Sequence, residues 1–162
     1  MSIINALITG RTQADVERAN YLNSLWVQHV WTGTPEELAE WEAGAKGAYN
    51  ASDLNRVQEA MEYLAGVFGA YGYTVGLQPM RIWAEGDIPT ASDLDAYLAN
   101  LAALRAMLDM PFTTPAVPAD MALLTYIEAN NIERILVDIN RLLLNAAAAW
   151  FYSDEIYCGE VT

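Results

Sequence analysis

The two side chains best suited to nucleophilic or metal chemistry each occur once, because His29 is the only histidine and Cys158 the only cysteine. A thiol beside an imidazole is a nucleophile, and imidazole is a common metal ligand. Here the pair lies near opposite ends of the chain, and a single histidine excludes multi-histidine metal sites. We therefore expect no catalytic residues, no metal site and no cofactor.

Carboxylates are the remaining groups that could do chemistry. The chain has 21 Asp and Glu residues, so some pairs at glycosidase spacing arise by chance and carry no information. The acidic runs at 36–42 and 154–155 lack the spacing and glycine of a calcium loop. No phosphate-binding glycine loop, Gly-x-Ser-x-Gly or Cys-x-x-Cys motif occurs. These absences predict that the protein is not an enzyme.

Composition indicates a folded, acidic protein. Apolar residues make up 54% of the 162 residues, and the net charge is −13. The electric field of so negative a protein repels nucleic acid and anionic membrane surfaces, so we expect neither as a partner. No apolar run reaches the roughly 20 residues that a membrane span needs, and a single cysteine suits synthesis in a reducing cytoplasm.

One short phrase, Ala-Ser-Asp-Leu, occurs at 51–54 and again at 91–94, with weaker copies near 14 and 129. A residue able to cap a helix precedes each copy, and an acid follows that residue three positions later. This is the arrangement of a capping box, in which the acid also favours the positive end of the helix dipole. Asp53 and Asp93 are therefore interpreted as helix-start residues, and the arginines at a shared offset, Arg18, Arg56 and Arg134, as part of a solvated, ion-paired face.

Apolar residues follow each phrase at steps of three and four, which is typical of a helix with one buried face. The stripes are Leu54, Val57, Met61, Leu64 and Phe68, then Leu94, Tyr97, Leu101, Leu104 and Leu108, then Ile132, Ile135, Ile139, Leu142 and Ala146. A rougher first stripe runs through Val16, Ala19, Trp26 and Val30. We expect a mostly α fold, a bundle of four principal helices with a short extra helix at about 35–42.

Glycines, prolines and β-favouring residues indicate the structure of the segments that connect the predicted helices. We expect a single helical domain over 1–162 with extended or hairpin segments near 71–84 and 150–162. Its remaining parts are an N-terminal segment at 1–10, a proline-rich connector at 111–119 and a C-terminal arm at 150–162.

Aromatic residues suggest where the chain meets a partner. Trp150, Phe151 and Tyr152 are consecutive, so they cannot all lie on one side of a helix or strand. Together with Tyr157 they form a hypothetical partner interface, although packing over the bundle's own end explains them equally well. The alternative is a small-ligand or carbohydrate-binding module in which exposed Trp83 or Trp150 stacks against the ligand.

Four segments carry a resemblance to known proteins: "RTQADVERANYLN", "KGAYNASDLNRV", "LTYIEANNIERIL" and "AAAAWFYSDEIYCGEV". They resemble small proteins encoded among the tail and fibre genes of bacteriophages and prophages of Gram-positive, often gut, bacteria. The most recognisable piece runs from Tyr49 to Val57. The resemblance implies a virion structural or assembly protein, tail-associated and made in the bacterial cytoplasm, whose partners are other virion proteins or further copies of itself.

Overall fold

The computed structural model describes the backbone of residues 2–153 and the side chains of residues 2–148. Within that range the chain is mostly helical. Its elements in order are a short 3-10 helix η1 (Ile3–Ala6), α1 (Gln13–Ser24), the strands β1 (Trp26–Val27) and β2 (Val30–Trp31), α2 (Pro35–Glu42), α3 (Ala51–Ala70), α4 (Ala91–Arg105) and α5 (Tyr126–Ser153).

The helix starts are set locally, and the capping prediction is confirmed. Thr12, Thr34, Asn50 and Thr90 each accept a hydrogen bond from the backbone of the acid three residues on, whose carboxylate accepts one in return. Thr125 and Glu128 exchange the same bonds at the start of α5. Each box satisfies two backbone N–H groups that the helix itself leaves unpaired.

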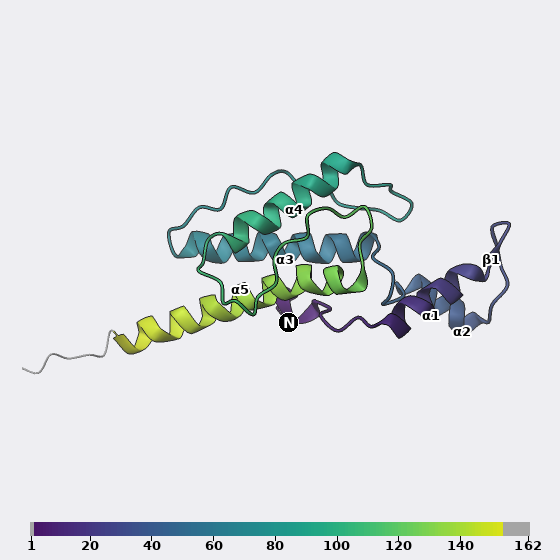
Figure 1. The fold of residues 1–162 in the computed structure, drawn as a ribbon, viewed down its shortest axis with the longest axis horizontal. Coiled ribbons are helices and arrows are strands. Elements are labelled where there is room, and N and C mark those ends of the chain that lie inside the picture. The colour runs from purple at the N-terminus through teal and green to yellow at the C-terminus, as the bar shows by residue number, and fades with distance from the viewer. Residues whose placement is uncertain (1, 154–162) are drawn as a thin grey trace, which may run out of the picture.

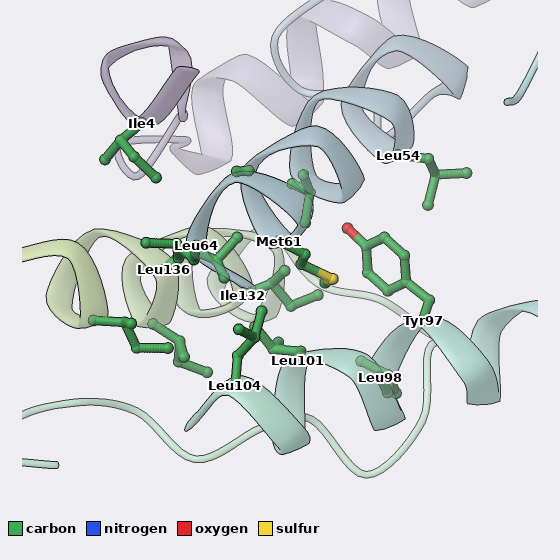
Figure 2. Packing of buried hydrophobic residues seen from close by; sticks show 14 of the residues in the cluster. Ile4, Leu54, Met61, Leu64, Tyr97, Leu98, Leu101, Leu104, Ile132 and Leu136 are labelled. Carbon is green, nitrogen blue, oxygen red and sulfur yellow. The ribbon is translucent and has the colours of Figure 1, made fainter. Parts of the chain in front are cut away.

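The main core lies between α3, α4 and α5 (Figure 1). The stripe predicted on α3 is confirmed, because all five of its residues are buried. On α5 the buried face passes through Leu136 and Leu143, whereas Ala146 is exposed. Figure 2 shows Met61 and Leu64 of α3 meeting Leu101 and Leu104 of α4 and Ile132 of α5. The 3-10 helix adds Ile4 to the same cluster.

Helices α1 and α2 form a smaller unit beside this bundle (Figure 1). Ala19, Leu22 and Ala45 are its buried residues, with Trp31 and Trp41 packed around them. At Gly47 the loop that leaves this unit touches the start of α1 so closely that a Cβ atom would lie 2.0 Å from the carbonyl oxygen of Asp15. Only glycine fits there. Of the four long helices, three therefore share the main core and α1 stands apart.

The first helix is shorter than its apolar stripe predicted. It ends at Ser24, and Trp26 pairs with Trp31 in an antiparallel hairpin that Gln28 and His29 turn. The expectation that Trp26 and Val30 continue the helix is wrong, because the β-branched and aromatic residues here favour a strand as much as a helix. Near 71–84, where an extended or hairpin segment was expected, the chain forms an irregular loop without a strand.

The C-terminal prediction is corrected in part. Residues 150–153, expected to begin an extended arm, continue α5 as far as Ser153. The run of four alanines before them has the highest helix propensity of any residue type, which carries the helix onward. The rest of the predicted arm lies outside the described residues.

The proline-rich segment at 111–119 is an irregular connector, as expected. It is held by side chains of the bundle, since Nε of Arg105 donates to the carbonyl of Pro115 at 2.9 Å. The hydroxyl of Thr114 donates to the Asp138 carboxylate at 2.7 Å. Both bonds tie the connector to α4 and α5.

Candidate functional site

Four charged side chains from three parts of the chain meet inside the molecule. Arg11 precedes α1, Asp53 and Arg56 belong to the first turns of α3, and Glu133 lies on α5. Nη2 of Arg11 lies 2.7 Å from the Asp53 carboxylate and 2.8 Å from that of Glu133. Nη2 of Arg56 lies 2.9 Å from Glu133 and also bonds Asp53. We call these four residues the buried charge cluster.

Backbone groups around the cluster bond Arg11 and Glu133, whereas the buried Nε of Arg56 has no hydrogen-bond partner in the described part of the chain. Arg11 donates from Nη1 to the carbonyl of Ile8 and from Nε to that of Lys46, at 2.7 and 3.2 Å. The backbone N–H of Ile8 donates to Glu133. Asn130 exchanges two hydrogen bonds with the backbone of Arg11, at 2.9 and 2.8 Å. These bonds fasten the extended segment before α1 to α3 and α5.

A pair of tyrosines borders the cluster. The hydroxyls of Tyr49 and Tyr97 lie 2.6 Å apart, and the guanidinium of Arg11 lies 5.4 Å from the centre of the Tyr49 ring. Burial raises the pKa of the Tyr97 phenol well above 10.0, and burial likewise raises the pKa of Tyr49. Both phenols therefore stay protonated and act as hydrogen-bonding groups.

The cluster is built for stability more than for reaction. Its two arginines and two carboxylates balance in charge, and the side chains of Arg11, Asp53 and Glu133 are 1%, 6% and 0% exposed. Burial lowers the pKa of Arg56, but hydrogen bonds to Glu133 and Asp53 outweigh that effect and raise the pKa above its ordinary value. None of the four residues lines the cavity described below. Removing one member of such a network leaves a buried charge without a partner, which is strongly destabilising. The buried charge cluster is therefore important for the fold.

Three residues of the Tyr49–Val57 phrase thus have partners that local reasoning missed. Asp53 caps α3 with one carboxylate oxygen and joins the buried charge cluster with the other. Arg56, interpreted as a solvated ion-paired residue, is 15% exposed at its side chain and belongs to the cluster. Asn55 exchanges two hydrogen bonds with the backbone of Trp83, both of 2.8 Å. The other arginines at this offset fit the prediction, since Arg18 and Arg134 are exposed and pair with Glu40 and Asp138.

A cavity of about 510 Å³ lies between the α1–α2 unit and the bundle. The end of α2, the start of α3 and the loop at 83–87 form its walls. Two indoles, Trp41 and Trp83, belong to that lining, together with the polar residues Asn50, Ser52 and Asn55. Sequence reasoning did not single out Trp41, because nothing local shows that its helix end faces α3.

Trp83 is not the exposed stacking residue that was expected, because it is only 5% exposed. Its indole N–H donates to Gln58 at 2.7 Å, and the Arg81 guanidinium lies 4.4 Å from the ring centre. The loop at 77–84 lacks a strand to hold it, so Gln58 and Asn55 of α3 bind it through side chains. Trp83 anchors this loop on the core.

The predicted interface residues lie at or beyond the limit of the described side chains. Trp150, Phe151 and Tyr152 belong to the last turn and a half of α5, where the backbone alone is described. Tyr157 lies outside the described residues, as does Cys158. His29 lies in the exposed turn of the hairpin.

Exposed apolar side chains gather at the hairpin. Val27 and Val30 are 51% and 62% exposed, and Trp26 is 40% exposed. The rings of Trp26 and Trp31 make an edge-to-face contact with centres 5.3 Å apart. Figure 1 places this hairpin at one end of the long axis and the C-terminal end of α5 at the other.

Residues 2–153 contain no cluster of three or more His, Cys, Asp or Glu side chains arranged to hold a metal ion. No helix in that range is long and apolar enough to cross a bilayer. Comparisons with protein-family models, curated proteins and solved structures found no match to this chain.

Proposed function

We propose that the chain is a non-enzymatic structural or assembly protein of a bacteriophage or prophage virion, associated with the tail and acting through protein–protein contacts. The phage assignment rests on the resemblance of the four segments quoted above. The contact role rests on the exposed apolar hairpin, where Val27 and Val30 stand more than half exposed at one end of the molecule. A protein partner would remove that surface from water.

The negative net charge of the chain limits which classes of partner can bind it. A chain with a net charge of −13 repels nucleic acid and anionic lipid, whereas it attracts a basic protein surface over several ångströms. Other virion proteins and further copies of this chain are the proposed partners. The proposed anchors are Trp150, Phe151, Tyr152 and Tyr157, since aromatic residues dominate the binding energy of interfaces.

Incorporation into particles tests the proposal. The chain is expressed in a strain that carries the parent phage or prophage, with its native copy deleted, and its amount in purified particles is measured by quantitative mass spectrometry. We expect wild type to copurify with tails and the double variant Val27→Glu/Val30→Glu to be lost from them. Ile82→Glu is the matched control, because Ile82 is 89% exposed and lies in another loop. Purified particles that lack the wild-type chain, or that take up both variants equally, would contradict it.

A second candidate is a small-ligand or carbohydrate-binding module, and one observation favours it. The cavity of about 510 Å³ combines two indoles with amide and hydroxyl groups, which is the lining that sugars and small polar ligands bind. Titration of the protein with soluble oligosaccharides, followed by tryptophan fluorescence, tests it. Trp41→Ala should abolish a saturable change while Trp26→Ala should leave it intact, and an absence of any saturable change in wild type excludes this candidate.

A further inference from the structure

The cavity between the α1–α2 unit and the bundle has carboxylates around its two indoles. Glu42 at the end of α2 belongs to its lining, as do Glu85 and Asp87 in the loop that follows Trp83. Among the described side chains, no lysine or arginine lines it. A hollow lined by charges of one sign concentrates the electric field, so this cavity attracts cations more strongly than a flat acidic surface does.

Two of the three carboxylates have no cation of their own. Asp87 pairs with Arg81, and the N–O distance is 2.8 Å. Glu42 and Glu85 are exposed and form no ion pair within residues 2–148. A cation that enters the cavity therefore meets two carboxylates that it does not share with another charged group of that range.

The surroundings of Trp83 show which kind of cation suits this lining. Cζ of Arg81 lies 4.4 Å from the centre of the Trp83 ring, while Nη2 of the same side chain binds Asp87. A planar guanidinium stacks on an indole and donates to a carboxylate at the same time, which a compact ammonium group does less well. Arg81 does not itself line the cavity, where Trp41 provides a second indole next to Glu42 in the chain. The cavity thus repeats, without a resident arginine, the residue types that hold Arg81.

We propose that this cavity binds an arginine side chain presented by a protein partner. Its guanidinium stacks on Trp41 and donates hydrogen bonds to the free carboxylates of the lining, Glu42 and Glu85. The volume of about 510 Å³ is larger than one side chain needs and lies within the roughly 300–1,000 Å³ of ligand sites in general. The residues that flank the arginine in the partner therefore enter the cavity with it.

The inference deepens the proposed function, because it names the chemistry of one partner, and it rests on that function for its biological use. It is measured on the purified chain with a synthetic peptide. A chain that binds no arginine peptide would overturn the inference and leave contacts through the hairpin standing. Absence of the chain from virions would overturn the proposed function and leave the arginine site standing.

Peptide binding is the test. The purified full chain is titrated, by isothermal titration calorimetry, with a short peptide that has arginine at its centre and with the same peptide carrying citrulline there. Citrulline has the shape of arginine, but its urea group is uncharged. We expect the arginine peptide to bind saturably and the citrulline peptide to bind at least about tenfold more weakly, because it lacks the charge-assisted hydrogen bonds and the cation–π contact.

A pair of double variants separates the cavity from the overall charge. Glu42→Gln/Glu85→Gln should weaken binding of the arginine peptide at least about tenfold. Asp95→Asn/Asp109→Asn is the matched control and should bind nearly as wild type does, since both residues are exposed and neither lines the cavity. Each double variant removes two negative charges, so the general attraction of the chain for a cation falls equally in both.

The indole is tested by Trp41→Leu, which keeps an apolar side chain in the packing around Leu22. Loss of the aromatic ring should weaken binding of the arginine peptide at least about threefold. The melting temperature is measured in parallel, and the exposed positions Glu42 and Glu85 carry the test if this variant unfolds. A folded Trp41→Leu chain that binds as wild type does would overturn the proposed stacking.

Other occupants of the cavity give different results. The proposal is overturned if the arginine peptide does not bind saturably, if citrulline replaces arginine without loss, or if the two double variants weaken binding equally. Propylguanidine has the arginine side chain without a peptide backbone, and its binding as tightly as the peptide would overturn a protein as the source. An oligosaccharide that binds wild type and Glu42→Gln/Glu85→Gln equally, while the arginine peptide does not bind, would assign the cavity to a sugar instead.

Discussion

The guanidinium of Arg11 lies 2.8 Å from the carboxylate of Glu133, and both side chains are closed to solvent. The contact joins the segment before α1 to α5. From α3, Asp53 pairs with Arg11 and Arg56 pairs with Glu133. Buried charges are costly to desolvate, so a network of this kind persists only when every member is bonded.

Asp53 and Asp93 occupy the same position in two copies of one phrase, so the same substitution at both is an internal control. Asp53→Asn removes a carboxylate from the buried charge cluster, and we expect a loss of about 3 kcal/mol or more in the free energy of unfolding. Asp93→Asn weakens an exposed cap at Thr90 and should cost much less. Urea denaturation of both variants measures the difference. Equal losses would show that Asp53 acts as a cap only.

Arg11 and Lys46 test the attachment of the α1–α2 unit. Arg11→Met leaves two buried carboxylates with Arg56 as their only cation, so the melting temperature should fall sharply. Lys46→Met removes an exposed pair with Asp15, whose N–O distance is 3.0 Å, and should have little effect. Limited proteolysis should also cut the Arg11→Met chain faster in the segment before α1. Identical melting of the two variants would contradict the assigned role.

The cap at Thr90 predicts a pH dependence of stability. A side-chain hydrogen bond and then a backbone hydrogen bond from Thr90 hold the pKa of Asp93 below 3.8. A lowered pKa in the folded state means that the cap stabilises the protein above pH 3.8 and loses its effect as the pH falls through the folded-state pKa. The stability gap between wild type and Asp93→Asn should therefore shrink below that pH. Denaturation curves over a pH series measure it, and a gap that grows on acidification would contradict the sign.

The hairpin turn contains backbone strain that can be removed. Gln28 and His29 adopt φ angles of 49° and 64°, a region that costs side chains other than glycine and asparagine roughly 1 kcal/mol per residue. Asn-Gly is the pair preferred for a turn with both central φ angles positive. The double variant Gln28→Asn/His29→Gly should raise the melting temperature by a few degrees. The comparison variant Gln28→Gly/His29→Leu keeps a bulky residue at the second position, so its melting temperature should rise less. An equal rise for both variants would contradict the explanation.

Local chemistry was sufficient to predict where the helices start. A cap residue, an acid three positions later and an apolar repeat are all close in sequence, so their bonds form within one turn. The starts of α2, α3 and α4 and the buried stripe of α3 were predicted correctly for this reason. The boundary of α1 was not, because residues 25–31 suit a helix and a hairpin about equally and packing against Trp31 and Trp41 selects the hairpin.

What the sequence could not decide is which polar side chain meets which. Asp53 and Asp93 have the same neighbours in the chain, yet the arrangement of α3 against Arg11 and α5 buries one and leaves the other at the surface. Trp83 follows a run of loop residues and is buried against the main core, where Gln58 and Asn55 on α3 bind it. Ion pairs and hydrogen bonds of this kind form only where groups from segments remote in sequence are placed to within a few tenths of an ångström of the bonding distance. Such distances are set by how the helices pack, and no local pattern of residues encodes them.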